Sequence, residues 1–160
     1  MRKAFFAASP LSERVFTNPA GDADLFNTRA IHGAEIPAVG GITTARSLAR
    51  MYAATIGEIG GVRLLNDETV ASLSTTQSRG PDMVLAGVET HFGLGFMLPS
   101  WFSPMGGPRS FGHPGAGGSV GFADPEAGVA AGYVMNKMAA NLAGDPRARG
   151  LIDAVYASIE

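Results

Sequence analysis

Residues 109–136 decide the fold of this chain, and they read RSFGHPGAGGSVGFADPEAGVAAGYVMN. The segment contains three short strand-like runs, Arg109–Gly115, Ser119–Ala123 and Val129–Asn136. The last two runs are joined by the residues DPEAG, in which Asp124 opens the turn, proline follows it and glycine closes it. That order suits a type I turn that closes a β-hairpin. The segment therefore predicts an antiparallel meander.

A further strand is predicted just before this segment. From residue 90 the hydrophobic period is two, because large apolar side chains at Phe92, Leu94, Phe96 and Leu98 alternate with other residues. Such alternation is typical of a strand with one buried face. We therefore expect three or four antiparallel strands within residues 90–136.

A first long helix is predicted upstream of the strands. Thr43 or Thr44 can cap its N-terminus, because a hydroxyl accepts hydrogen bonds from the free N–H groups of the first turn. Gly60-Gly61 is expected to end it, since glycine adopts the left-handed conformation at little cost. The expected apolar stripe of this helix is Leu48, Tyr52 and Ile56.

Two more helices are predicted from their caps. Asn66 precedes an acidic first turn and starts a helix that ends near Ser74. Asp145 and Pro146 are placed as N-cap and first residue of a C-terminal helix. The expected buried face of that helix is Leu151, Val155 and Ile159, with Ile152 and Tyr156 alongside.

The order of these elements predicts a single α+β domain over residues 1–160. Residues 1–89 are expected to be mainly helical or irregular, with one short helix near the start. Residues 90–136 are expected to form the antiparallel strands, and residues 145–159 a helix that covers the sheet. Strands and helices do not alternate along the chain, so a parallel sheet is not predicted.

The composition excludes several classes of function. Hydrophobic residues make up 46% of the 160 residues and charged residues 16%, which excludes intrinsic disorder. The net charge of −2 gives no basic field for nucleic acid. There is no cysteine, so disulfides and thiolate metal sites are excluded. No histidine has a partner at metal-ligand spacing, and we expect neither a metal nor a cofactor.

No membrane segment or export signal is predicted within the chain. The apolar stretch Ala4–Ala8 is too short for a signal peptide, and it ends at Ser9-Pro10. No run approaches the roughly 18 apolar residues of a membrane helix. A soluble protein is expected, with the cytoplasm as the default location.

Residues 117–121 read GGSVG and match G-x-S-x-G, the nucleophile elbow of α/β-hydrolases. That motif requires a helix after the serine and a histidine later in the chain. Here a hairpin is predicted after Ser119, and the last histidine is His113. The alternative is that Ser119 is a strand residue beside glycines that allow a close approach of another backbone. By itself, His113 suits a structural role or a catalytic one.

The same segment resembles a known family. His113-Pro114-Gly115, followed by AGGS, ADPE and YVMN, is similar to the third conserved box of the serine β-lactamase superfamily. The branch it resembles contains class C β-lactamases, penicillin-binding-protein-like enzymes and carboxylesterases. There the box reads Lys-Thr-Gly, or His-x-Gly in esterase-like members. Upstream stretches such as NTR, EIP and GITTARSLAR extend the resemblance over nearly the whole chain.

The resemblance implies roles for the residues of the box. His113 would contact a substrate carboxylate or assist proton transfer, and the Ala116 N–H would be one of two oxyanion-hole donors. The expected substrate-binding residues are Pro114, Gly115, Gly117 and Gly118. Pro114 departs from the usual hydroxyl residue of the box, which favours an ester over a β-lactam. The implied substrate is a small ester, amide or β-lactam.

Two other boxes of the family are absent from this sequence. The nucleophile box is Ser-x-x-Lys, and neither Lys3 nor Lys137 has a serine three residues before it. The Tyr-x-Asn box is also missing. The chain is therefore expected to be the C-terminal part of a longer serine hydrolase and to be inactive alone.

Two further expectations follow from that reading. Residues Val129–Asn136 should present an open sheet edge, covered by the missing N-terminal half or by a second copy of the chain. The alternative function is a non-catalytic binding or interaction module that has kept the scaffold.

Overall fold

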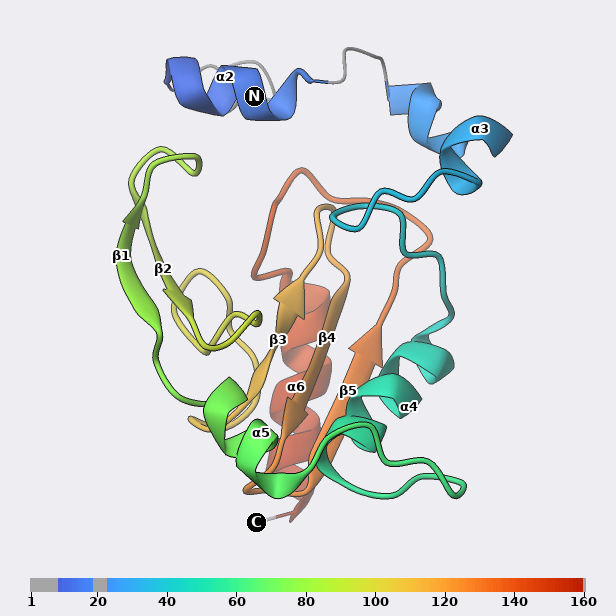
Figure 1. Ribbon diagram of the computed structural model, residues 1–160, viewed down its shortest axis with the longest axis vertical. Coiled ribbons are helices and arrows are strands. Elements are labelled where there is room, and N and C mark those ends of the chain that lie inside the picture. The colour runs from blue at the N-terminus through green and yellow to red at the C-terminus, as the bar shows by residue number, and fades with distance from the viewer. Residues whose placement is uncertain (1–8, 19–22, 160) are drawn as a thin grey trace. The chain divides into compact units, whose positions relative to one another are not determined.

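The computed structural model describes residues 9–18 and 23–159, which belong to two compact units (Figure 1). The first unit comprises Met1–Thr43 with Asp82–Gly87, and the second comprises Thr44–Pro81 with Val88–Glu160. The apolar stretch of residues 4–8 lies outside the described residues. In the part of the chain that the structure describes, no helix has the length and hydrophobicity needed to span a bilayer.

The first unit contains short helices. They are α2 (Pro10–Phe16), the 3-10 helix η1 (Ala23–Asn27) and α3 (Arg29–His32). Helix α2 begins where the Ser9 hydroxyl accepts a hydrogen bond from the Ser12 N–H at 3.0 Å. The buried Ser12 hydroxyl donates to the Val84 carbonyl at 2.7 Å and ties the helix to residues 82–87. The short helix predicted near the start of the chain is thus confirmed.

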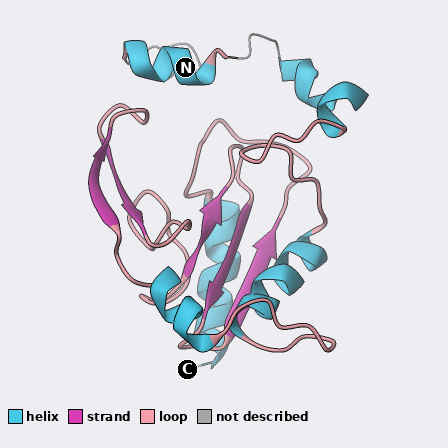
Figure 2. Cartoon of the chain, in the orientation of Figure 1, coloured by secondary structure: helices cyan, strands magenta, loops and turns pink. Residues whose placement is uncertain are grey.

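The second unit is built on a three-stranded antiparallel sheet in the order β3-β4-β5 (Figure 2). The strands are β3 (Phe111–Pro114), β4 (Val120–Asp124) and β5 (Val129–Tyr133). The predicted meander is confirmed: β3 and β5 are shorter than predicted, and β4 has the predicted length but begins one residue later. The Asp124 carboxylate accepts hydrogen bonds from the Glu126 and Ala127 N–H groups, which closes the predicted turn.

Helices cover the sheet in the second unit. They are α4 (Ala45–Ile56), α5 (Asp67–Leu73) and α6 (Pro146–Ile159), and α6 runs behind the strands in Figure 1. Each begins at its predicted cap: the side chains of Thr44, Asn66 and Asp145 accept hydrogen bonds from N–H groups of the first turn. The predicted α+β class is confirmed.

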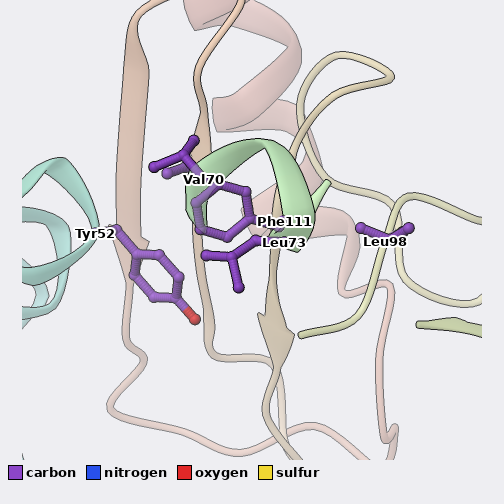
Figure 3. Close-up of a cluster of buried hydrophobic side chains, with 6 residues drawn as sticks. Tyr52, Val70, Leu73, Leu98 and Phe111 are labelled. Carbon is purple, nitrogen blue, oxygen red and sulfur yellow. The ribbon is translucent and has the colours of Figure 1, made fainter. Parts of the chain in front are cut away.

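Two hydrophobic clusters lie on opposite faces of the sheet. The first cluster is Tyr52, Val70, Leu73, Leu98, Phe111 and Ala123, shown in Figure 3. The second is Met97, Met105, Val120, Phe122 and Ala148. Successive residues of a strand point to opposite faces, so Phe122 and Ala123 belong to different clusters.

Helix α4 approaches the sheet closely because two glycines face it. Gly121 and Gly132 are directly opposite each other in the β4–β5 register. A Cβ on Gly132 would lie 2.6 Å from the Ala45 carbonyl oxygen, and one on Gly121 would overlap the Tyr52 ring. The predicted stripe of α4 is confirmed, since Tyr52 is buried and Leu48 and Ile56 pack against the first cluster.

Three details of the sequence prediction are wrong. Residues 92–98 do not form one strand, because Gly93 and Gly95 make a reversal in which Gly93 N–H donates to Phe96 O at 2.9 Å. Only single bridges join Phe92 to Met97 and Met97 to Gly112. Helix α4 ends at Gly57, and Gly60-Gly61 forms a separate turn between bridged residues 59 and 62.

The third error concerns the face of α6. Leu151, Val155 and Ile159 are exposed. Ile152 and Tyr156, which were predicted alongside them, do pack on the core together with Ala148. Both stripes are apolar at helical spacing, so periodicity alone did not choose between them.

A second, two-stranded sheet was not predicted. It consists of β1 (Ser78–Asp82) and β2 (Val88–Phe92). Strand β1 reads SRGPD and is mostly exposed, so it has no hydrophobic alternation that a sequence reading could detect. An ion pair between Arg79 and Glu89 links the two strands at 2.8 Å.

Candidate active site

His113 lies near the end of β3, on the sheet face that Phe111 shares, and its side chain is exposed. Its Nδ1 is 2.6 Å from the Pro114 carbonyl oxygen. Because a carbonyl only accepts, this contact requires the hydrogen on Nδ1 and leaves Nε2 free to face a ligand. The ring therefore has a defined tautomer and one available nitrogen.

A buried tyrosine supports the backbone at His113. Burial raises the pKa of Tyr52 to about 12, while a hydrogen bond with the main chain of His113 acts in the opposite direction. Tyr52 is thus a neutral phenol at ordinary pH. It fixes the strand beneath the histidine and adds no charge there.

The loop between β3 and β4 holds the other predicted site residues. Gly115 N–H donates to the Ser119 carbonyl at 2.6 Å, and Gly118 N–H donates to the Gly115 carbonyl at 3.1 Å. Ala116 is exposed at the tip, and within the described residues its N–H makes no hydrogen bond. Within the described residues of this loop, the N–H groups of Ala116 and Ser119 make no hydrogen bond, and Ala116 is the exposed residue of the two.

The glycines of this loop contact other parts of the chain. Gly117 and Gly118 are buried and have φ of 89° and 122°, a conformation that favours glycine. A Cβ on Gly117 would overlap Met138, and one on Gly118 would overlap the Asp145 carboxylate. Their conformation is required by this packing, and direct contact of either residue with a substrate stays a prediction.

Ser119 does not occupy a nucleophile elbow. Strand β4 begins at the next residue, and an elbow requires a helix there. A Cβ on Gly115 would overlap the Ser119 hydroxyl, so the serine fills the space beside that glycine. The other histidines make local contacts: His32 Nε2 lies 2.9 Å from the Phe26 carbonyl oxygen, and His91 Nε2 lies 2.7 Å from the Thr76 hydroxyl.

A polar cluster holds this loop in place, and it was not predicted from the sequence. Arg147 donates to the Gly117 carbonyl at 3.2 Å and to the Lys137 carbonyl at 2.9 Å. Its Nε and Nη2 also donate to the buried Asp145 carboxylate. Asn141 donates to the same carboxylate at 3.1 Å. Hydrogen bonds from Arg147 hold the pKa of Asp145 well below its usual range. Only the N-cap position of Asp145 was visible in the sequence.

A cavity of about 10 Å³ lies behind the loop, lined in part by Pro114, Gly118, Asp145 and Ile152. A volume of that size holds about one water molecule. This cavity is therefore too small for an organic ligand.

The sequence of this chain is similar to those of known proteins. The family model described as Beta-lactamase matches residues 4–155. The esterase/beta-lactamase LipL of Mycobacterium tuberculosis (strain ATCC 25618 / H37Rv) is 45% identical over 108 residues, which are 66% of this chain and 24% of that protein.

Solved structures match over almost the whole chain. The crystal structure of a family VIII carboxylesterase gives a TM-score of 0.81 at 33% identity and covers 98% of this chain and 41% of that one. A penicillin-binding protein homologue from Caulobacter crescentus gives a TM-score of 0.75 at 38% identity, covering 97% and 39%. The chain therefore spans about a quarter of the curated relative and two fifths of these structures.

Proposed function

Since this chain belongs to the beta-lactamase family, we propose that it supplies one wall of the active site of a serine hydrolase. The resemblance found in the sequence is thus confirmed at the level of the family. The proposed reaction is acyl-enzyme hydrolysis: a serine attacks the substrate carbonyl, the leaving group departs, and water releases the acid. His113 and Ala116 are the residues of this chain that take part.

The observation that carries the proposal is the free N–H of Ala116 beside His113. An oxyanion hole needs N–H donors that are aimed at the substrate oxygen and not engaged elsewhere. Ala116 is an exposed residue, and its N–H makes no hydrogen bond to any residue that the structure describes. One such donor is worth about 2.7–4 kcal/mol of transition-state stabilisation.

His113 contributes through Nε2. Its Nδ1 hydrogen is engaged by the Pro114 carbonyl, so Nε2 can accept a proton or hydrogen bond when neutral and can donate when protonated. In the proposed site it binds a polar group of the substrate or assists proton transfer to the leaving group.

An ester is the favoured substrate. Pro114 stands where the family's box has a hydroxyl residue, so one side-chain hydrogen bond to a substrate is lost. Two of the similar proteins are named as an esterase/beta-lactamase and a carboxylesterase, which supports this choice. Amides and β-lactams are the remaining members of the proposed substrate class.

The serine and its lysine are proposed to come from an N-terminal portion that carries Ser-x-x-Lys. Strand β5 has a place for such a portion, because among the described strands it pairs only with β4. An unpaired edge invites another strand. A second copy of this chain is the other proposed occupant, and light scattering of the isolated chain distinguishes them: a monomer at micromolar concentration excludes the second copy.

The test is a chimera that places this chain behind the N-terminal portion of the family VIII carboxylesterase. We expect the chimera to hydrolyse a p-nitrophenyl ester and the 160-residue chain alone to be inactive. Ala116→Pro removes the N–H and should lower kcat by about 10²–10³. Ala116→Gly retains the N–H and is the matched control, with kcat close to that of the parent.

Two results would contradict the proposal. Turnover by the isolated chain would show that it contains its own nucleophile. Equal kcat values for Ala116→Pro and Ala116→Gly would show that this N–H is not an oxyanion donor.

A further inference from the structure

We propose that the Asp145–Arg147 ion pair is a positioning device that aims the Ala116 N–H at the substrate. This inference rests on the proposed function, because it assigns the ion pair a role in the same site. Arg147 contacts the loop through the Gly117 carbonyl, and Asp145 contacts it at Gly118. Both act through the loop between β3 and β4.

The orientation of one peptide unit determines where the Ala116 N–H points. The Gly115 carbonyl and the Ala116 N–H belong to the same peptide, and in a trans peptide they point in opposite directions. The Gly115 carbonyl is held inside the loop by the Gly118 N–H at 3.1 Å. The Ala116 N–H therefore points away from the inside of the loop, and no residue that the structure describes accepts a hydrogen bond from it.

Gly118, whose N–H donates to the Gly115 carbonyl, contacts the ion pair. A Cβ added to Gly118 would overlap the Asp145 carboxylate and would lie 3.0 Å from Arg147 Nη2. The backbone of Gly118 is thus in contact with the charged groups themselves. The φ of 122° at Gly118 allows this approach.

Gly117 is the residue after Ala116 in the loop. Its carbonyl accepts hydrogen bonds from Arg147 at 3.2 Å and from the Ala139 N–H at 2.8 Å. Its own N–H donates to the Asn141 carbonyl at 2.9 Å. Both polar groups of Gly117 are therefore anchored to residues 137–147, so the loop cannot rotate about this residue without breaking them.

The ion pair is itself rigid. The Asp145 side chain is 1% exposed and accepts from Arg147 Nε at 2.9 Å and Nη2 at 2.7 Å, a two-point pairing. Asp145 also caps helix α6, and Arg147 lies in its first turn. The loop is thus fixed to the end of a helix that packs on the sheet.

The test uses the 160-residue chain and needs no catalysis. The ¹⁵N order parameter of the Ala116 amide should be about 0.85 in the parent chain and below about 0.6 in Arg147→Ala. The matched control is Arg63→Ala, because Arg63 has a similar side-chain exposure, pairs with Asp67 and donates to the Leu65 carbonyl. That variant should keep the parent value.

Arg147→Lys is the second variant, in case Arg147→Ala does not fold. Lysine keeps the charge but cannot donate in a planar fork to the carboxylate and to two carbonyls. Its Ala116 order parameter should lie between the two values. An unchanged order parameter in a folded Arg147→Ala or Arg147→Lys chain would overturn the inference.

A kinetic readout in the chimera separates this inference from the proposed function. If both hold, Arg147→Ala lowers kcat about tenfold to a hundredfold with little change in KM. If Ala116 loses order while kcat is unchanged, the positioning holds and the oxyanion role of Ala116 fails. If kcat falls while Ala116 stays ordered, the positioning role is wrong.

Discussion

Two neighbouring connections of one sheet are built in different ways. The β4–β5 turn is closed by its own residues, since the Asp124 carboxylate accepts from the N–H groups of Glu126 and Ala127. The β3–β4 loop is held by residues 137–147, about twenty to thirty positions further along the chain. In the first, the turn's own Asp124 engages two main-chain N–H groups, and in the second no described residue accepts from the Ala116 N–H.

The difference is consistent with the proposed role of the β3–β4 loop in the active site. In the turn, Glu126 and Ala127 N–H groups are already engaged by Asp124, whose carboxylate is also held by Gly107 and Tyr156. A loop that is supported from behind can keep a donor unpaired on its outer side without collapsing around it. We therefore expect the two connections to respond differently to substitution.

The largest expected effect is at Gly118 in the loop. Gly118→Ala places a methyl group into the Asp145 carboxylate at a φ of 122°, and the free energy of unfolding should fall by about 3 kcal/mol. Gly128→Ala in the turn is the matched control, because Gly128 also has positive φ but no atom lies within 4 Å of the added carbon.

Gly128→Ala should cost only the conformational strain, about 1 kcal/mol. Urea unfolding of the two variants at one pH measures the difference. Equal losses would mean that the ion pair does not support the loop at Gly118.

A smaller effect is expected where the turn contacts helix α6. The Tyr156 hydroxyl donates to the Asp124 carboxylate at 2.6 Å. Tyr156→Phe keeps the ring and should lower the free energy of unfolding by about 1.5 kcal/mol, the value of a hydrogen bond to a charged group. Because the turn closes itself, the amide shifts of Glu126 and Ala127 should hardly change. Large shifts there would show that the turn also depends on support from elsewhere.

The smallest expected effects are on the pH dependence of the free energy of unfolding. Burial acts to raise the pKa of Asp124, but hydrogen bonds from the Tyr156 hydroxyl and three N–H groups outweigh it and lower the pKa. The pKa of Asp145 is lowered chiefly by its hydrogen bonds with Arg147. A carboxyl whose folded pKa is lowered stabilises the fold above its unfolded pKa, and this contribution is lost as the pH falls through the folded value.

The free energy of unfolding should therefore fall as the pH decreases below about 5. Asp124→Asn and Asp145→Asn should each reduce the slope of the free energy of unfolding against pH. The reduction should be at most about 1.4 kcal/mol per pH unit, which corresponds to one proton. The Asp145→Asn chain should also loosen the Ala116 amide, whereas Asp124→Asn should not. Identical slopes for both variants and the parent would contradict the assignment of either carboxylate.

Local signals in the sequence predicted much of the fold. The caps at Thr44, Asn66 and Asp145 and the turn after Asp124 depend on residues within a few positions of one another, and all are confirmed. The role of Ala116 was implied by the family resemblance of the box around His113, and it stays a prediction.

The rest depends on contacts that no local pattern contains. The choice between the two apolar stripes of α6 is made by the sheet, which receives Ile152 and Tyr156 and leaves Leu151 exposed. The hydrogen bond from Arg147 to the Gly117 carbonyl, which holds the loop, joins residues thirty positions apart. Strand β1 is fixed by pairing with β2 and has no hydrophobic period of its own.

The central claim is that this chain provides the His113 and Ala116 wall of a hydrolase site and no activated serine. Intact-mass spectrometry after incubation with a fluorophosphonate tests it most directly, because the reagent modifies activated serines covalently. The account predicts no adduct on the 160-residue chain. A single stoichiometric adduct, above all at Ser119, would contradict it.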